Sequence, residues 1–239
     1  MRILGIETAT SICSAAILDG DRTLADHTLH TPQMHSEKLL PLIDECFSDA
    51  ALTLRDIDGI AVSIGPGSFT GLRIGLSVSK GLSFASGKPL VGVPSLEALA
   101  FFMTLVLPVA DRTAILPVID ARRNEVYAAL YHYTHSGGLR EIHPSTAVAV
   151  EDLETLLSAN GALIVVGDGA EKAGRFLKTH PRFGPAEFHP EIQPHARAVA
   201  ALGEGRLRDG KFADAGELEP LYGKEFYTTM KPIALSEVR

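Results

Sequence analysis

The chain has 239 residues, of which 46% are hydrophobic and 21% are charged, and its formal net charge is −7. These values are typical of a globular protein with a sizeable core, and they exclude a disordered or low-complexity chain. The acidic balance argues against a protein that holds nucleic acid on its own, because such proteins carry a basic patch.

The first residues enter an alternating strand-like pattern directly, without the charged start and apolar run of a signal peptide. No apolar stretch reaches the roughly 20 residues that a membrane-spanning helix needs. We therefore expect a cytoplasmic protein that does not associate with a membrane. Its two cysteines, Cys13 and Cys46, are too few for a disulfide framework or a zinc cluster, and we expect both in the core.

Antiparallel strands followed by helices are predicted for the first half of the chain. Alternating and apolar runs predict strands at residues 3–6, 12–18, 23–30, 60–64 and 90–93, and the first three of these form a meander. Helical spacing predicts three helices that end near residues 50, 86 and 106. The side chains expected to cap these helices are Ser36, either Ser68 or Thr70, and Ser95.

The same order is predicted again from residue 114 onward. Residues 114–119 and 126–133 form a hairpin, and residues 164–166 form a further strand. Helices are expected at residues 151–159, 171–179 and 195–208. The pattern therefore restarts at a seam near residue 108, although no repeat is detectable by residue identity.

A meander followed by helices, occurring twice, is typical of the actin, hexokinase and Hsp70 superfold, called ASKHA. The order of elements predicts an α/β fold with two similar lobes, each built from a mixed sheet and helices. The lobes are expected at residues 1–108 and 109–239, and the helix at residues 195–208 is expected to pack back on the first lobe.

The turn after the first strand contains Glu7, Thr8 and Thr10, which predict a vestigial nucleotide-binding turn. Backbone amides and hydroxyls there can cradle a phosphate while the carboxylate holds magnesium through water. The superfold usually has Asp-x-Gly-Thr at this place, but here the acid is a glutamate and no glycine flanks Thr8. The alternative is a polar turn that only connects two strands.

Small residues recur every four positions along the helix that follows the glycine-rich segment 65–71. They are Gly71, Gly75, Ser79, Ser83 and Gly87. The segment is not a P-loop, because no Gly-Lys-Ser/Thr follows it. A stripe of small side chains lets another backbone approach closely, and the sequence leaves open whether that backbone belongs to the chain's own sheet or to another subunit.

Signatures of a metal centre or a hydrolase are incomplete. The nine histidines include no H-E-x-x-H motif or other dense ligand cluster. Residues 81–85 lack the last glycine of a G-x-S-x-G elbow and lie in a predicted helix. We therefore expect neither a metal site nor catalytic residues.

Four segments, taken in order, make the sequence similar to the TsaB family. They are residues 3–9 (ILGIETA), 35–41 (HSEKLLP), 65–75 (GPGSFTGLRIG) and 93–99 (VPSLEAL), and the glycine-rich block is specific to this family and its close relatives. The second half of the chain is compatible with the family. It departs from the family pattern after Tyr222, where an arginine is expected and Gly223-Lys224 is found.

The resemblance implies a non-catalytic subunit that binds and activates the catalytic paralogue TsaD in the synthesis of N6-threonylcarbamoyladenosine (t6A) in tRNA. TsaD transfers the threonylcarbamoyl group to tRNA, and the ATPase TsaE joins the pair. The resemblance also implies that ATP and a metal belong to the partner subunits, and that this chain holds no cofactor. It implies that tRNA is reached only through the complex. The sequence leaves open whether the chain alone is a monomer or a homodimer.

Pairing in the family brings the first helices of the lobes together as a small bundle, which places the partner interface on the helices that end near residues 50 and 86. The interface residues expected from this resemblance are Leu40, Phe47, Gly71, Leu72, Gly75, Val78, Ser79 and Leu82.

The catalytic paralogue carries two metal-binding histidines four residues apart. Aligned on the Val-x-x-x-Glu frame of Val93 and Glu97, those places hold Ser95 and Leu99 here, and leucine cannot bind a metal. This comparison favours a partner over an enzyme. The alternatives are an ATP-dependent enzyme of the same superfold such as a kinase, a metallopeptidase, and a homodimeric scaffold unrelated to tRNA.

Overall fold

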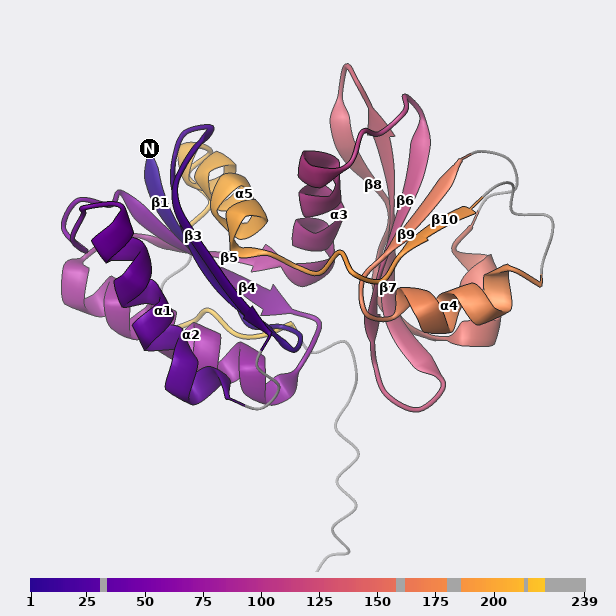
Figure 1. Ribbon diagram of the computed structural model, residues 1–239, viewed down its shortest axis with the longest axis horizontal. Helices are drawn as coiled ribbons and strands as arrows, with labels where there is room; N and C mark the ends of the chain where they lie inside the picture. The colour runs from indigo at the N-terminus through magenta and orange to yellow at the C-terminus, as the bar shows by residue number, and fades with distance from the viewer. Residues whose placement is uncertain (31–33, 158–161, 180–185, 213–214, 222–239) are drawn as a thin grey trace, which may run out of the picture.

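The computed structural model describes residues 1–30, 34–157, 162–179, 186–212 and 215–221. The chain forms two lobes, each built on a five-stranded mixed sheet with helices packed against it (Figure 1). The predicted α/β fold with two similar lobes is confirmed. No helix of the described residues is long and apolar enough to cross a membrane.

The first sheet combines an antiparallel meander with two parallel strands. β1 (Arg2–Glu7), β2 (Ile12–Asp19) and β3 (Arg22–His30) form the meander. β4 (Gly59–Gly65) runs parallel to β1 and β5 (Leu90–Pro94) runs parallel to β4, so that the order is β3-β2-β1-β4-β5. The turn between β1 and β2 therefore lies at the carboxyl edge of β1, beside the end of β4.

The second sheet repeats this arrangement. β6 (Thr113–Asp120), β7 (Glu125–Thr134) and β8 (Gly138–Ala149) form the meander, while β9 (Leu163–Val166) and β10 (Ala186–His189) are parallel to β6. The order β10-β9-β6-β7-β8 matches that of the first sheet strand for strand. The sequence analysis missed β8 and β10. β8 is an exposed edge strand with Pro144 and two register irregularities, so its alternation is weak.

Helices separate the two sheets and cover their outer faces (Figure 1). α1 (His35–Asp49) and α2 (Phe69–Ser86) cover the outer face of the first sheet. The 3-10 helix η1 (Val150–Thr155) and α4 (Ala170–Leu177) cover the second sheet in the same way. The helix predicted at residues 151–159 is thus a shorter 3-10 helix, and residues 158 and 159 lie outside the described part of the chain.

Two more helices lie between the sheets. α3 (Ser95–Val106) packs mainly against the second sheet, and α5 (Ala196–Arg208) packs against β1, β2 and β4 of the first. The approach of α5 to β1 is so close that a Cβ added at Gly5 would lie 2.2 Å from the carbonyl oxygen of Ala196. The last helix of the described residues therefore completes the first lobe.

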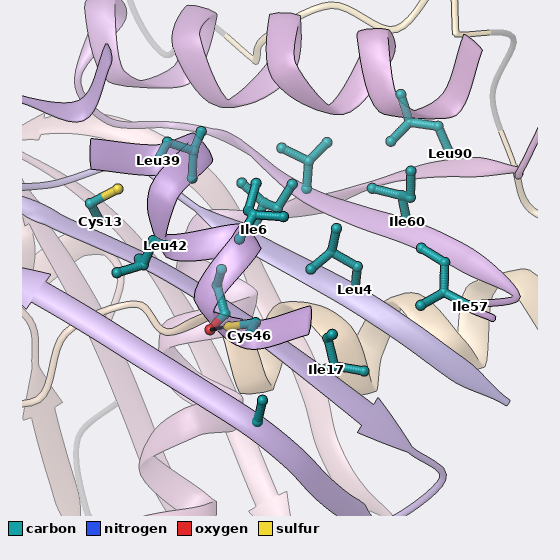
Figure 2. Close-up of a cluster of buried hydrophobic side chains, with 14 of the residues drawn as sticks. Leu4, Ile6, Cys13, Ile17, Leu39, Leu42, Cys46, Ile57, Ile60 and Leu90 are labelled. Atoms are coloured by element: carbon teal, nitrogen blue, oxygen red, sulfur yellow. Dashed lines mark hydrogen bonds between the residues drawn. The ribbon is translucent and has the colours of Figure 1, made fainter. Parts of the chain in front are cut away.

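The core of the first lobe lies between its sheet and the pair α1 and α2 (Figure 2). It contains fully buried aliphatic side chains such as Ile6 and Leu39, and it contains Cys13 and Cys46. Both cysteines are free and buried, which confirms their predicted place in the core. Burying each large aliphatic side chain contributes about 1.5–3 kcal/mol, so this cluster fixes α1 and α2 firmly on the sheet.

The predicted helix caps are confirmed at one position and wrong at two. The Ser68 hydroxyl accepts a hydrogen bond from the amide of Gly71 and caps α2, as expected. α1 begins at His35 after Met34 and has no capping side chain, so Ser36 is not a cap. Ser95 is the first residue of α3, and its hydroxyl instead accepts from the amide of Gly65.

Candidate functional site

The turn between β1 and β2 holds a buried carboxylate. Glu7 is fully buried, and its Oε1 accepts hydrogen bonds from the amide of Ala9 at 2.6 Å and from the hydroxyl of Ser63 at 2.9 Å. Burial outweighs these hydrogen bonds and raises the pKa of Glu7 to about 7. Within the described residues, Oε2 of Glu7 and the hydroxyl of Thr8 have no hydrogen-bond partner. Neither group faces solvent.

The glycine-rich segment and the start of α2 cover this turn. A Cβ added at Gly67 would lie 2.3 Å from the carbonyl oxygen of Ala9, and one added at Gly71 would lie 2.1 Å from that of Thr8. A Cβ at Gly75 would lie 2.3 Å from the Thr8 hydroxyl oxygen. Since real Cβ atoms do not approach so closely, these three glycines are required by contacts inside the chain.

A cleft of about 780 Å³ separates the lobes next to this turn. Thr10, Ser11 and His35 line it from the first lobe, and Asp120 and Arg122 line it from the second. Of the predicted nucleotide-binding residues, only Thr10 reaches the cleft, whereas Glu7 and Thr8 lie under α2 and do not line it. The Glu7 carboxylate and the Thr8 hydroxyl therefore lie under the chain's own helix, while Ala9, Thr10 and Ser11 of the same turn line the cleft, and nucleotide binding there stays a prediction.

The turn between β6 and β7 forms the opposite wall of the cleft. Arg122 and Arg123 adopt left-handed backbone angles, with φ of 67° and 52°. Asp120 Oδ1 accepts from the amide of Arg122 at 2.7 Å and from Lys172 Nζ at 2.5 Å, and Lys172 also donates to the carbonyl of Arg123. These bonds hold a conformation that costs non-glycine residues about 1–2 kcal/mol each.

The pKa values of two carboxyl groups in this wall are shifted in opposite directions. Burial raises the pKa of Asp168, whose Oδ1 accepts from the amide of Asp120 at 2.8 Å. Burial also acts on Asp120, but the hydrogen bond from Lys172 and its positive charge outweigh it and hold the pKa of Asp120 below its usual range. The wall therefore combines an ionised carboxylate, a lysine and an exposed arginine. The β6–β7 turn itself (residues 121–124) contains no glycine, whereas Gly167 and Gly169 flank Asp168 beside it.

The places of the paralogue's metal ligands are part of the core. Ser95 and Leu99 are fully buried, and the Ser95 hydroxyl accepts a hydrogen bond from the amide of Gly65 at 3.1 Å. Among the described residues, no group of three His, Cys, Asp or Glu side chains could hold a metal ion. Leu99 packs between α3 and the second sheet, where it has an apolar role.

Known proteins resemble this chain over nearly its whole length. The model of the family "TsaD: tRNA N6-adenosine threonylcarbamoyltransferase" matches residues 26–181. The tRNA threonylcarbamoyladenosine biosynthesis protein TsaB of Bacillus subtilis is 33% identical over 93% of this chain and 93% of its own length. TsaB of Escherichia coli is 34% identical over 71% of this chain and 72% of its own length. The chain belongs to the TsaB family.

The solved structure of YeaZ from Pseudomonas aeruginosa agrees with this assignment. It matches with a TM-score of 0.80 and 27% identity, over 92% of this chain and 99% of that chain. The ethanolamine utilization protein EutJ of Carboxydothermus hydrogenoformans has a TM-score of 0.50 at 12% identity and shares the fold alone. The ASKHA fold predicted from the order of elements is confirmed in this TsaB-family protein.

The structure divides the eight expected interface residues into two groups. Leu40 is 49% exposed on α1, and Phe47, Val78 and Leu82 are half-buried along α1 and α2. The other four residues are buried inside the chain, which corrects the expectation that they present side chains to a partner: Gly71, Leu72, Gly75 and Ser79. The start of the small-residue stripe, Gly71 and Gly75, faces the β1–β2 turn, because α2 passes over Thr8 there.

Gly81 and Phe84, of which the sequence analysis did not select Phe84, lie on the exposed side of α2. Phe84 is 92% exposed, and a Cβ added at Gly81 would meet no atom within 4 Å. Gly81 therefore lacks the internal reason that explains Gly75. The sequence did contain a sign of this exposed side. Gly81 lies within the helix but outside the four-residue stripe, and Phe84 is three positions further along.

Proposed function

We propose that this TsaB-family protein is a non-catalytic, cytoplasmic subunit of the t6A synthesis machinery. It binds and activates a TsaD-type transferase through the outer sides of α1 and α2. The relatives in Escherichia coli and Bacillus subtilis are named for the biosynthesis of tRNA threonylcarbamoyladenosine. The proposal extends the function in those names to this chain and adds the partner and the surface.

The observation that carries the proposal is the exposed apolar side chain that each of these two helices presents. Leu40 is exposed on α1 and Phe84 is exposed on α2, while Phe47, Val78 and Leu82 are half-buried at the edge of the core that these helices cover. Exposed aromatic and aliphatic side chains on a helix face are typical anchors of a protein interface. Gly81 adds a place where a partner backbone can approach, because no described residue of the chain uses that space.

The covered turn supports a non-catalytic role over an ATP-dependent enzyme of the same fold. Glu7 and Thr8 lie under α2, so a nucleotide phosphate could reach them only if α2 moved off the sheet. Ser95 and Leu99 provide no metal ligand pair for a peptidase or a transferase. In this proposal the TsaD-type and TsaE-type subunits supply ATP and metal chemistry, and tRNA is bound through the complex.

A binding titration with one variant and one matched control tests the proposal. Phe84→Asp places a charge in the interface and is expected to weaken binding to the TsaD-type transferase of the same cell about a hundredfold. Leu105→Asp, at a 44% exposed position on α3, is expected to leave the affinity unchanged. Isothermal titration measures both, after melting curves show that both variants are folded.

An activity assay addresses the non-catalytic part. The chain alone, supplied with tRNA, threonine, bicarbonate and ATP, should form no t6A, whereas the combined partner proteins should form it. Modified nucleoside produced by this chain alone would overturn the proposal, and so would equal affinities for the wild type and Phe84→Asp.

A further inference from the structure

A groove of about 370 Å³ runs between α2 and residues 215–221, a segment called here the C-terminal strap. The strap follows α5 in the chain but lies on the opposite side of the first sheet, where Leu218 and Ala215 join the core beneath α2. The groove is lined by Arg73, Leu76, Ser77 and Lys80 of α2 and by Leu218, Glu219 and Pro220 of the strap.

Three contacts fix the strap in place. The amide of Leu221 donates to the carbonyl of Ile64 at 2.7 Å, at the carboxyl end of β4. Lys80 Nζ donates to the carbonyl of Gly216 at 3.2 Å. The side chain of Leu218 lies over β5, where a Cβ added at Gly92 would come within 3.1 Å of it. The groove is therefore already formed in the free chain.

The charge of α2 distinguishes this groove from the rest of the protein. α2 carries two cations, Arg73 and Lys80, and no acidic residue, in a chain whose net charge is −7. The Arg73 guanidinium carbon lies 3.8 Å from the centroid of the Phe69 ring, which holds it at the rim. The Lys80 ammonium group donates to one neutral carbonyl and has three N–H donors, so it can also donate to a carboxylate.

Both α2 and the strap also contribute apolar side chains to the groove. They are Leu76 on α2 and Leu218 and Pro220 on the strap. A ligand that fits this combination has an aliphatic stem and a negatively charged end, which describes an extended glutamate or aspartate side chain. Glu219 is the one acid in the lining, and it repels such a ligand from the strap side.

The groove is continuous with the surface proposed for the partner. Arg73, Ser77 and Lys80 lie on the outward side of α2, and Gly81 and Phe84 follow one to two turns further along the same side. We propose that the groove receives an acidic side chain of the TsaD-type transferase, and that the C-terminal strap is therefore part of the partner interface. This inference rests on the function proposed above.

Two substitutions on opposite walls of the groove test it because they change affinity in opposite directions. Lys80→Glu is expected to weaken binding to the transferase roughly tenfold at low ionic strength. Glu219→Gln removes the opposing charge and is expected to strengthen binding about threefold. Both effects should shrink at ~0.5 M salt, because exposed charges are then screened. Isothermal titration at two salt concentrations gives the affinities.

The control is Arg55→Glu, which reverses an exposed cation on the loop between α1 and β4 and should change the affinity less than twofold at either salt concentration. Melting curves of each variant identify any loss of folding, and the neutral variant Lys80→Gln serves in place of Lys80→Glu if the latter is unstable.

The outcomes separate this inference from the proposed function. If the wild type does not bind the transferase, the proposed function fails and the groove inference fails with it. If the wild type binds and Phe84→Asp weakens binding, but Lys80→Glu and Glu219→Gln bind as the wild type does, only the groove inference is overturned. It is also overturned if sedimentation shows that these substitutions change self-association and leave transferase binding unchanged.

Discussion

The two lobes share one strand order and differ in the helices that cover their outer faces. In the first lobe, α1 has 15 residues and α2 has 18, whereas η1 and α4 of the second lobe have 6 and 8. The long pair leaves Leu40 and Phe84 exposed after the core is filled. The strand order therefore defines the fold, while the longer covering helices place exposed apolar side chains on the first lobe, where the partner surface is proposed.

The equivalent turns of the lobes are stabilised in different ways. The β1–β2 turn is covered by α2, whose glycines allow contact with Thr8 and Ala9. The β6–β7 turn remains at the surface of the cleft and is held by Lys172 from α4. One turn depends on close packing around a buried acid, and the other depends on a charged hydrogen-bond network.

The largest expected effect in this comparison comes from removing the buried charge of the first turn. Glu7 has a pKa of about 7 in the folded chain against an ordinary value of 4.5. The folded state therefore holds a proton that the unfolded state releases, and stability falls as pH rises from about 4.5 to 7 and stays low above it. The side chain in Glu7→Gln cannot ionise. At pH 8 the free energy of unfolding of this variant should therefore exceed that of the wild type by up to about 3 kcal/mol.

Urea denaturation of both proteins at pH 4.5 and pH 8 checks this. The two stabilities should agree at the lower pH and diverge at the higher one. A constant difference across the range would show that Glu7 ionises normally, and the contrast between the two turns would lose its electrostatic basis.

A pair of glycine substitutions separates the two sides of α2. Gly75→Leu should destabilise the fold by about 1–3 kcal/mol, since its side chain would collide with Thr8. Gly81→Leu enters open space and should stabilise the helix by up to about 1 kcal/mol. Thermal melting measures both changes. Equal losses of stability would mean that Gly81 is also packed inside the chain.

The affinities of the same two variants for the transferase should differ as well. Gly81→Leu should lower the affinity for the transferase while remaining fully folded, because it fills the approach that the proposed interface uses. Gly75→Leu that survives folding should keep its affinity.

The smallest expected effect concerns the second turn. Lys172→Met removes the ion pair with Asp120 and the bond to the carbonyl of Arg123. Both partners are partly exposed, so solvent screening limits the loss to about 1 kcal/mol. The paired Asp120 has a lowered pKa, so its contribution is complete at pH 7 and is lost as pH falls through that pKa. Urea denaturation at pH 7 and in acid measures this effect. The difference in stability between the variant and the wild type should be smaller in acid than at pH 7.

Much of this fold could be predicted because periodicity reports how strands and helices are buried. The strands from β1 to β7 alternate or are continuously apolar, and Ser68 precedes α2 with a capping hydroxyl. β8 escaped prediction because it is exposed and contains Pro144. The tail around Tyr222 lies outside the described residues, so its departure from the family pattern stays a prediction.

The candidate site was harder to predict than the fold. The sequence showed that Gly75 needs a close neighbour, but periodicity does not say which chain provides it. Thr8, sixty-seven positions earlier, is that neighbour, and only the parallel pairing of β1 with β4 brings it under α2. Phe84 was missed because an aromatic residue at helical spacing usually belongs to the core.

The crossing of α5 to the first sheet has a consequence for synthesis on the ribosome. Ile3, Ala16 and Ala61 face Ala196 and Ala200, so one side of the first sheet stays bare until nearly the whole chain has emerged. A nascent chain that ends at α3 would hold its covering helices on one side and expose an apolar sheet face on the other. The two lobes are thus not independent folding units, and a chain truncated before residue 196 should need chaperone protection to remain in solution.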